Sequence, residues 1–238
     1  MGDFAALDVA SIAYDVPWAV AAQVRLLRQN LGDLYLHTVF DNSGDPDRAA
    51  EIEQICRESS TRYVRVGPPG SRHEHALNVA ARDLVERGLP YCAFLDHDIF
   101  PRRPTRVVEL TEAAGFFGLR QLHTPSGSSY LWPGLACFSR AWLGDRKLDF
   151  KGIRGDVPEL DGDTGSILGG LFEPSDWDRM PQSEHSYQPI REDDENGVQS
   201  WGVELIGDWL HAMNVSDWKR VPDPEQRTQL LRELVDSL

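Results

Sequence analysis

The sequence has few cysteines, no long apolar run and no excess of basic residues, and each shortage excludes a class of protein. Its three cysteines, Cys56, Cys92 and Cys137, lie far apart within apolar patterns. Such a set predicts buried free thiols in a reducing compartment, because its spacing fits neither a disulfide framework nor a metal motif. No stretch approaches the ~18 apolar residues of a transmembrane helix, and the first residues do not resemble a secretory signal. We therefore expect a cytoplasmic protein.

The charge balance is acidic, with 38 acidic against 24 basic residues and a formal net charge of -14. An acidic chain is repelled by phosphate backbones and by anionic membranes, so general binding to either is disfavoured. A local basic patch at Arg102, Arg103 and Arg106 stays open. The hydrophobic content of 41%, with seven tryptophans, is sufficient for a sizeable core, and the length suits one large domain.

The first hundred residues alternate between strand and helix patterns. Strands are predicted over 9–14, 34–40, 62–66 and 91–95. Helices are predicted to begin at Pro17, at Pro46 and, after a Ser71–Glu74 capping box, near Arg72. This alternation with short loops predicts an α/β fold, a three-layer α/β/α domain with a mostly parallel central sheet.

The second half is less regular. A helix is expected over 105–114, and strands over 116–122 and 129–138, the latter interrupted at Trp132-Pro133-Gly134. A polar loop is expected over 175–197 and strand-like segments over 203–213. We expect one domain over residues 1–222, with a C-terminal helix over 223–238 packed on its surface.

The strongest chemical signal is the stretch from Tyr91 to Pro101, where an apolar strand runs into Asp96-His97-Asp98. At the carboxyl end of a parallel strand, two carboxylates face the crevice in which α/β folds bind ligands. They offer oxygen ligands to a hard cation, and such a cation can hold a diphosphate. The alternative is an acidic turn after a strand.

Four features in this order resemble the GT-A nucleotide-sugar glycosyltransferases, in particular the inverting family 2. They are Phe40-Asp41-Asn42-Ser43 after a strand, Ala76-Leu77-Asn78 in a helix, Asp96-His97-Asp98, and the segment from Trp132 to Phe138. The resemblance covers roughly residues 7–140. It implies a GT-A-like, Rossmann-like fold with a nucleotide-sugar-binding half over 1–100 and an acceptor-side half over 101–222.

The same resemblance implies a metal-dependent glycosyltransferase of the hexosyltransferase type. It would move a sugar from a nucleoside diphosphate, with a UDP-sugar as the first expectation, to an acceptor hydroxyl. Inversion is expected from the resemblance, and the sequence leaves retention open. The chain departs from the family at Leu160-Asp161-Gly162-Asp163-Thr164-Gly165, where a Glu-Asp pair is usual. It also lacks the polymerase-type Gln-x-x-Arg-Trp motif, so transfer is expected to be non-processive.

The metal ligands implied by the resemblance are carboxylates and one late histidine. Asp98 is expected to bind Mn²⁺ or Mg²⁺ directly, and Asp96 to face the ribose or bind the metal through water. His211 is the candidate third ligand, with a core histidine beside Trp209 as the alternative. His97 is expected to point away if the segment stays extended.

The donor candidates follow the first strands and open the third helix. Tyr14 could stack on the nucleobase beside Asp15, and Asp41 could accept a hydrogen bond from a nucleobase N–H. Arg72 could meet phosphate or a base carbonyl, and Asn78 could contact the donor. The alternatives are simple packing for Tyr14, a local turn for Asp41, a solvated arginine for Arg72, and polar packing against the loop after Asp98 for Asn78.

The acceptor side needs a general base and a platform. Asp163, with Asp161 in reserve, could deprotonate the acceptor hydroxyl, or Asp163 could cap a helix. Trp132, with Gly134 two residues after it, could form an acceptor platform, or Trp132 could belong to the core.

Two other functions are open. A nucleotidyltransferase would carry a basic, glycine-rich loop where Tyr14-Asp15-Val16-Pro17 stands. The other is a catalytically silent nucleotide-sugar-binding module. Such a module would not need Asp96, Asp98, Asp163 and His211 together. The acceptor is not named by the sequence: it could be a small molecule, a glycan, or a hydroxymethylated base in phage DNA, although the net charge disfavours DNA.

Overall fold

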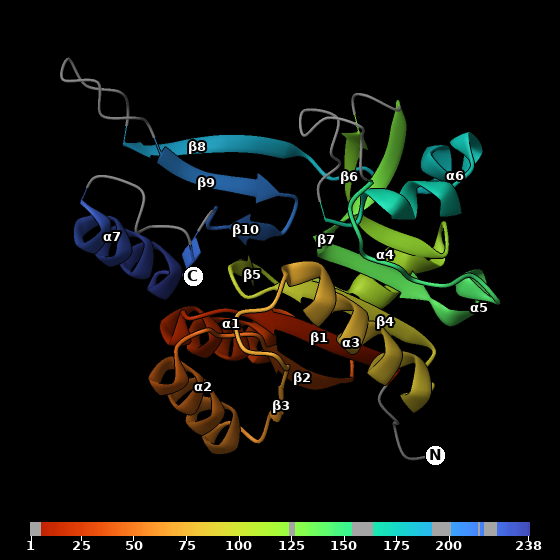
Figure 1. The fold of residues 1–238 in the computed structure, drawn as a ribbon. Helices are drawn as coiled ribbons and strands as arrows, with labels where there is room; N and C mark the ends of the chain where they lie inside the picture. Colours follow the sequence, from red (N-terminus) through yellow and green to blue (C-terminus); the bar gives the residue numbers. More distant parts are fainter. Residues whose placement is uncertain (1–5, 124–126, 154–163, 192–200, 214, 217–222) are drawn as a thin grey trace.

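Two β-sheets organise the chain, and a computed structural model describes residues 6–123, 127–153, 164–191, 201–213, 215–216 and 223–238 of it (Figure 1). The larger sheet has six strands in the order β3-β2-β1-β4-β7-β6, and the smaller has four in the order β5-β10-β9-β8.

The first half builds the parallel part of the large sheet. Its elements are β1 (Leu7–Ala13), α1 (Pro17–Asn30), β2 (Tyr35–Asp41), α2 (Pro46–Glu58), β3 (Arg62–Arg65), α3 (His73–Arg87) and β4 (Tyr91–Asp96). Strands β1 to β4 pair in parallel, while β7 is antiparallel to both of its neighbours. The predicted α/β fold with a mostly parallel central sheet is confirmed.

Local sequence signals explain where the helices begin and end. Pro17 and Pro46 stand in the first turns of α1 and α2, and the Asp45 side chain accepts hydrogen bonds from two backbone N–H groups of α2. Helix α3 ends at Gly88, whose φ of 77° favours glycine. The predicted capping box at the start of α3 is wrong, because the Ser71 hydroxyl instead donates a hydrogen bond to Asn42.

The second half adds short elements around the edge. They are β5 (Ile99–Pro101), α4 (Val107–Glu112), β6 (Phe116–His123), β7 (Ser128–Ser139), α5 (Arg140–Leu143), the 3₁₀ helix η2 (Ser166–Leu171), α6 (Pro174–Arg179), β8 (His185–Arg191), β9 (Trp201–Ile206), β10 (Trp209–His211) and α7 (Pro224–Asp236). The expected loop over 175–197 is wrong in part, because α6 and β8 occupy much of it. The small sheet that includes β8 is antiparallel throughout.

The predicted interruption of β7 appears as a shift in its pairing. Gly118 of β6 faces Ala136, whereas Arg120, two residues on, faces Leu131. The residues of β7 from Trp132 to Leu135 therefore bulge out of the ladder with β6. Bulges of this kind redirect side chains and are frequent beside functional sites.

The sheet faces are covered by different helices (Figure 1). Ala76, Ala80 and Leu84 of α3 pack with Ile12 and Phe94 on one face. Helices α1, α2 and α4 cover the other face. Buried side chains of α1 also pack against the small sheet and α7. No helix of the described residues is long and apolar enough to cross a membrane, and the three cysteines are buried and free.

Candidate functional site

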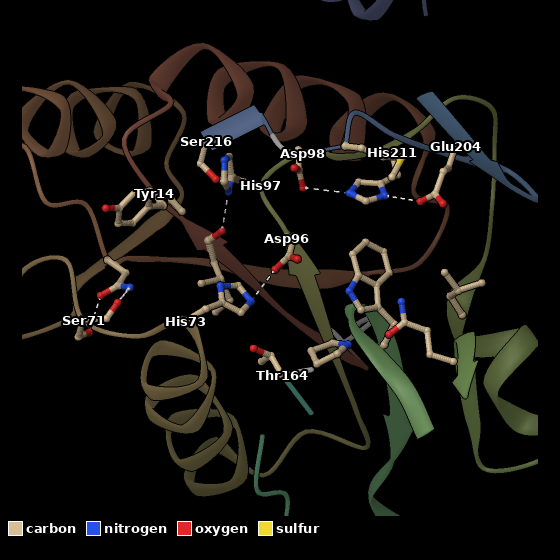
Figure 2. A pocket seen from close by; sticks show the side chains of 18 of the residues that line it. Tyr14, Ser71, His73, Asp96, His97, Asp98, Thr164, Glu204, His211 and Ser216 are labelled. Atoms are coloured by element: carbon tan, nitrogen blue, oxygen red, sulfur yellow. Dashed lines mark hydrogen bonds and ion pairs between the residues drawn. The ribbon is translucent and has the colours of Figure 1, made fainter. Parts of the chain in front are cut away.

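A cavity of about 700 Å³ opens where the carboxyl ends of the parallel strands meet the small sheet (Figure 2). Strands β1, β2 and β4 end at its floor, and β9, β10 and the bulge of β7 form its far wall. Its lining includes Tyr14, Asn42, Ser71, His73, Asp96, His97, Asp98, Trp132, Thr164, Glu204 and His211.

All three residues of Asp96-His97-Asp98 line this cavity. β4 ends at Asp96, and the next two residues form a turn, so the strand alternation that would direct His97 away does not continue. The His97 ring is fixed by its Nδ1, which donates a hydrogen bond to the Ile12 carbonyl at 3.0 Å. His97 therefore faces the site, which the extended-strand assumption did not predict.

Asp96 is paired with a histidine that sequence reasoning assigned no role. Its Oδ1 lies 3.0 Å from Nε2 of His73, the first residue of α3. Burial alone would raise the pKa of Asp96, but the positive charge and hydrogen bond of His73, with weaker effects of His97 and His211, hold it below its ordinary value. The contact with His73 therefore favours the ionised form of the Asp96 carboxyl.

Asp98 and His211 converge from two neighbouring strands. Ile99 of β5 faces His211 of β10, and this register brings Oδ1 of Asp98 to 3.9 Å from Nε2 of His211. Asp98 is 7% exposed, and its Oδ1 has no hydrogen-bond partner among the described residues. A buried acceptor of this kind is costly unless a ligand satisfies it.

Glu204 of β9 lies behind His211 and holds its other nitrogen. Nδ1 of His211 donates to Oε2 of Glu204 at 2.7 Å. Burial alone would lower the pKa of His211, but Glu204 and the negative charge of Asp98 raise it. The hydrogen bond from His211 in turn lowers the pKa of Glu204.

Asp98 and His211 fit a hard divalent cation whose remaining coordination positions are filled by water and by substrate phosphates. Within the described ranges, no group of three or more His, Cys, Asp or Glu side chains is placed to hold a metal ion. Asp98 and His211 instead supply one oxygen and one nitrogen from one side of the cavity. Mg²⁺ characteristically binds one or two carboxylates and takes its remaining ligands from water and substrate phosphates, and Mn²⁺ accepts similar ligands.

The donor candidates after the first two strands separate into two groups. Tyr14 lines the cavity. Asp15, with a φ of 51°, accepts a hydrogen bond from the Asp45 backbone. Asp41 is fully buried, and its carboxylate accepts hydrogen bonds from Tyr63 and Arg65. The nucleobase contact of Asp41 stays a prediction, and its carboxylate is already satisfied within the protein.

Arg72 and Asn78 lie beside the cavity lining, not within it. The side chain of Arg72 is 70% exposed and pairs with Glu74. Asn78 donates to the Asp149 carboxylate and accepts from the backbone N–H of Phe150. Asn78 is therefore packed against polar groups, as the sequence allowed, but the expected partner was wrong: Asn78 contacts residues 149–150 and not the loop after Asp98.

Trp132 faces the metal candidates from the bulge of β7. Its ring centroid lies 4.6 Å from that of His211, with a tilt of 47°. A Cβ on Gly134 would lie 2.2 Å from the Trp132 ring, so only glycine leaves this ring in place. Asp161 and Asp163 lie outside the described residues, while Thr164 lines the cavity.

Comparison with known proteins gives similarities among solved structures only. No family model and no curated protein matches the sequence. The structures include a mannosyltransferase from Pyrobaculum calidifontis in complex with GDP-Man and Mn²⁺, at 14% identity and a TM-score of 0.44 over 59% of this chain and 46% of the other. Another is S. aureus TarS, at 10% identity and a TM-score of 0.49 over 94% of this chain and 42% of the other.

A third is glucosyl-3-phosphoglycerate synthase from Mycobacterium tuberculosis with Mn²⁺, UDP and glucosyl-3-phosphoglycerate. It matches at 16% identity and a TM-score of 0.45 over 74% of this chain and 66% of the other. This chain spans less than two thirds of the length of each. Membership of the GT-A glycosyltransferases, and of family 2 among them, stays a prediction from the sequence motifs.

Proposed function

We propose that the chain is a metal-dependent glycosyltransferase that moves a sugar from a nucleoside diphosphate to an acceptor hydroxyl. The observation that carries this proposal is the convergence of Asp98 Oδ1 and His211 Nε2, 3.9 Å apart, at the carboxyl end of β4. The Asp98 oxygen is buried without a hydrogen-bond partner in the described part of the chain. When bound there, Mn²⁺ or Mg²⁺ neutralises the charge that develops on the departing diphosphate.

The chain's own residues arrange the donor around this point. Tyr14 offers an aromatic ring to the nucleobase at the end of β1. Asp96, whose ionised form is favoured by its contact with His73, accepts hydrogen bonds from ribose hydroxyls beside Asp98. A UDP-sugar is the first donor to test, followed by GDP- and dTDP-sugars.

The acceptor side lies across the cavity, where Trp132 and Thr164 line the wall. Trp132 presents an apolar surface suited to the flat face of a sugar or base, so the acceptor class ranges over small molecules, glycans and hydroxymethylated DNA bases. Asp163 is the proposed base for an inverting, non-processive transfer, with Asp161 in reserve.

Calorimetric titration of UDP, with Mn²⁺ and then with a chelator, tests the proposal. Binding should require the metal, and Asp98→Asn should weaken it at least about tenfold, since a loss of 1.4 kcal/mol is a factor of ten. His211→Ala should weaken it less, because water can replace one neutral ligand. The exposed Asp47 of α2 provides a matched control, and Asp47→Asn should leave the affinity unchanged.

Slow Mn²⁺-dependent hydrolysis of a bound sugar nucleotide would separate an enzyme from a silent binding module. Metal-independent binding of UDP, GDP and dTDP, or unchanged titrations in both site variants, would reject the proposed function.

A further inference from the structure

We propose that Glu204 is a positioning residue that holds His211 with its proton on Nδ1 and its Nε2 lone pair toward Asp98. This inference rests on the proposed function, since it concerns how His211 becomes a metal ligand. Neither Glu204 nor its contact with His211 carries a signal in the glycosyltransferase motifs of the sequence.

Strand register sets the contact. Glu204 of β9 and His211 of β10 face each other directly in an antiparallel pair. Opposed side chains on one sheet face stand about 5 Å apart at Cβ and can contact each other. Here Nδ1 of His211 lies 2.7 Å from Oε2 of Glu204.

The chemistry of this hydrogen bond determines the tautomer. An ionised carboxylate can only accept, so Nδ1 of His211 must carry the proton. In the neutral ring the other nitrogen, Nε2, then has a free lone pair. That nitrogen is the one that lies 3.9 Å from Oδ1 of Asp98.

Neighbouring groups hold both partners in this arrangement. The second oxygen of Glu204 lies 3.3 Å from Nε2 of His185 on β8, and the Trp132 ring packs on the His211 ring at 4.6 Å. The side chains of His211 and Glu204 are 12% and 20% exposed, which limits competition from water. The edge of His211 that bears Nε2 is directed toward Asp98, as Figure 2 shows.

Removing the Glu204 carboxylate should allow His211 to adopt either neutral tautomer. Without an acceptor at Nδ1, the proton of a neutral His211 can reside on Nε2, where it blocks metal binding. Carboxylates that orient metal-binding histidines typically contribute 10–100-fold to metal affinity. We therefore expect Glu204→Ala to weaken Mn²⁺ binding by about 10–100-fold.

The test measures Mn²⁺ affinity by the electron paramagnetic resonance signal of the free ion, without any sugar nucleotide. A second readout needs no metal: two-dimensional ¹⁵N–¹H correlation spectra of the imidazole ring at a pH where it is neutral report which nitrogen of His211 is protonated. The wild type should show the proton on Nδ1, and Glu204→Ala should show a shift toward Nε2.

Two further variants make the test specific. Glu204→Gln keeps an acceptor oxygen, so it should retain the Nδ1 proton and lose less Mn²⁺ affinity than alanine does. Glu184→Ala removes the same charge from an exposed position just before β8 and should change neither readout. If the alanine variant fails to unfold cooperatively, the glutamine variant decides: wild-type Mn²⁺ affinity with the proton on Nε2 would overturn the proposal.

The outcomes separate this inference from the proposed function. A wild type that does not bind Mn²⁺ would overturn both. A wild type that binds Mn²⁺, with a folded Glu204→Ala variant that binds it equally well and keeps the Nδ1 proton, would overturn only the positioning role of Glu204.

Discussion

Replacing Asp8 with asparagine should remove a specific part of the pH dependence of stability. Asp8 of β1 is fully buried, and its Oδ1 lies 2.9 Å from the guanidinium of Arg87. Burial raises the pKa of Asp8 from 3.8 to about 6, although Arg87 opposes the rise. At 1.36 kcal/mol per pKa unit, this difference corresponds to about 3 kcal/mol.

The sign follows from proton binding in the two states. Between pH 4 and pH 6 the folded protein holds the Asp8 proton more tightly than the unfolded chain does. The contribution of Asp8 to stability is therefore fully present below about pH 4 and is lost as the pH rises through about 6. Asparagine does not titrate. Between pH 4 and pH 6, the free energy of unfolding of Asp8→Asn should therefore fall by up to about 3 kcal/mol less than that of the wild type.

Urea unfolding of the wild type and of Asp8→Asn, at several pH values from 4 to 6, measures both free energies of unfolding. The contributions of other titrating groups cancel when one free energy is subtracted from the other. Arg87 keeps a second partner, Asp83, at 2.9 Å in the variant. Asp83 also provides an internal control, because the hydrogen bond from Arg62 lowers its pKa. The contribution of Asp83 to stability therefore grows as the pH rises, and Asp83→Asn should remove that increase. Parallel wild-type and Asp8→Asn curves would refute the assignment of a raised pKa to Asp8.

The remaining predictions concern the acceptor side. Gly134→Ala should destabilise the fold by about 1–3 kcal/mol, because the added methyl overlaps the Trp132 ring; the cost should largely vanish in a Trp132→Ala background, and an unchanged cost in a urea-based double-mutant cycle would contradict the overlap. Asp163→Asn should lower the rate of sugar transfer by about 10²-fold or more if Asp163 is the base, with donor affinity unchanged. A rate near that of the wild type would instead favour a helix cap, since asparagine caps about as well as aspartate.

The parallel half of the fold could be predicted because its signals are local. The strand expected over 91–95 is β4 (Tyr91–Asp96), and prolines mark the first turns of α1 and α2. Buried parallel strands are short apolar runs, and helices between them carry apolar stripes and caps. Placing Asp96 at the carboxyl end of β4 followed directly from these patterns.

The site was harder to predict wherever a turn or a bulge replaces regular geometry. His97 faces the cavity because β4 ends at Asp96 and His97 begins a turn. Pro133 and Gly134 indicated an interruption of β7, but the register shift that turns Trp132 toward the cavity appears only in the structure. The contact of His73 with Asp96 joins residues 23 positions apart across the start of α3. These contacts depend on tertiary packing, which no periodicity in the sequence reports.

One missed contact did carry a local signal. Glu204 and His211 flank the sequence Leu205-Ile206-Gly207-Asp208-Trp209-Leu210, in which glycine begins a two-residue link between apolar segments. Gly207 adopts a φ of 54°, as two-residue hairpin turns require at their first central position. Such a turn fixes the register of both strands, so residues three positions before and after it must face each other. A strand pattern with a Gly-Asp link therefore already implies the Glu204–His211 pair, and with it a carboxylate directed at the histidine that the resemblance selects as a metal ligand.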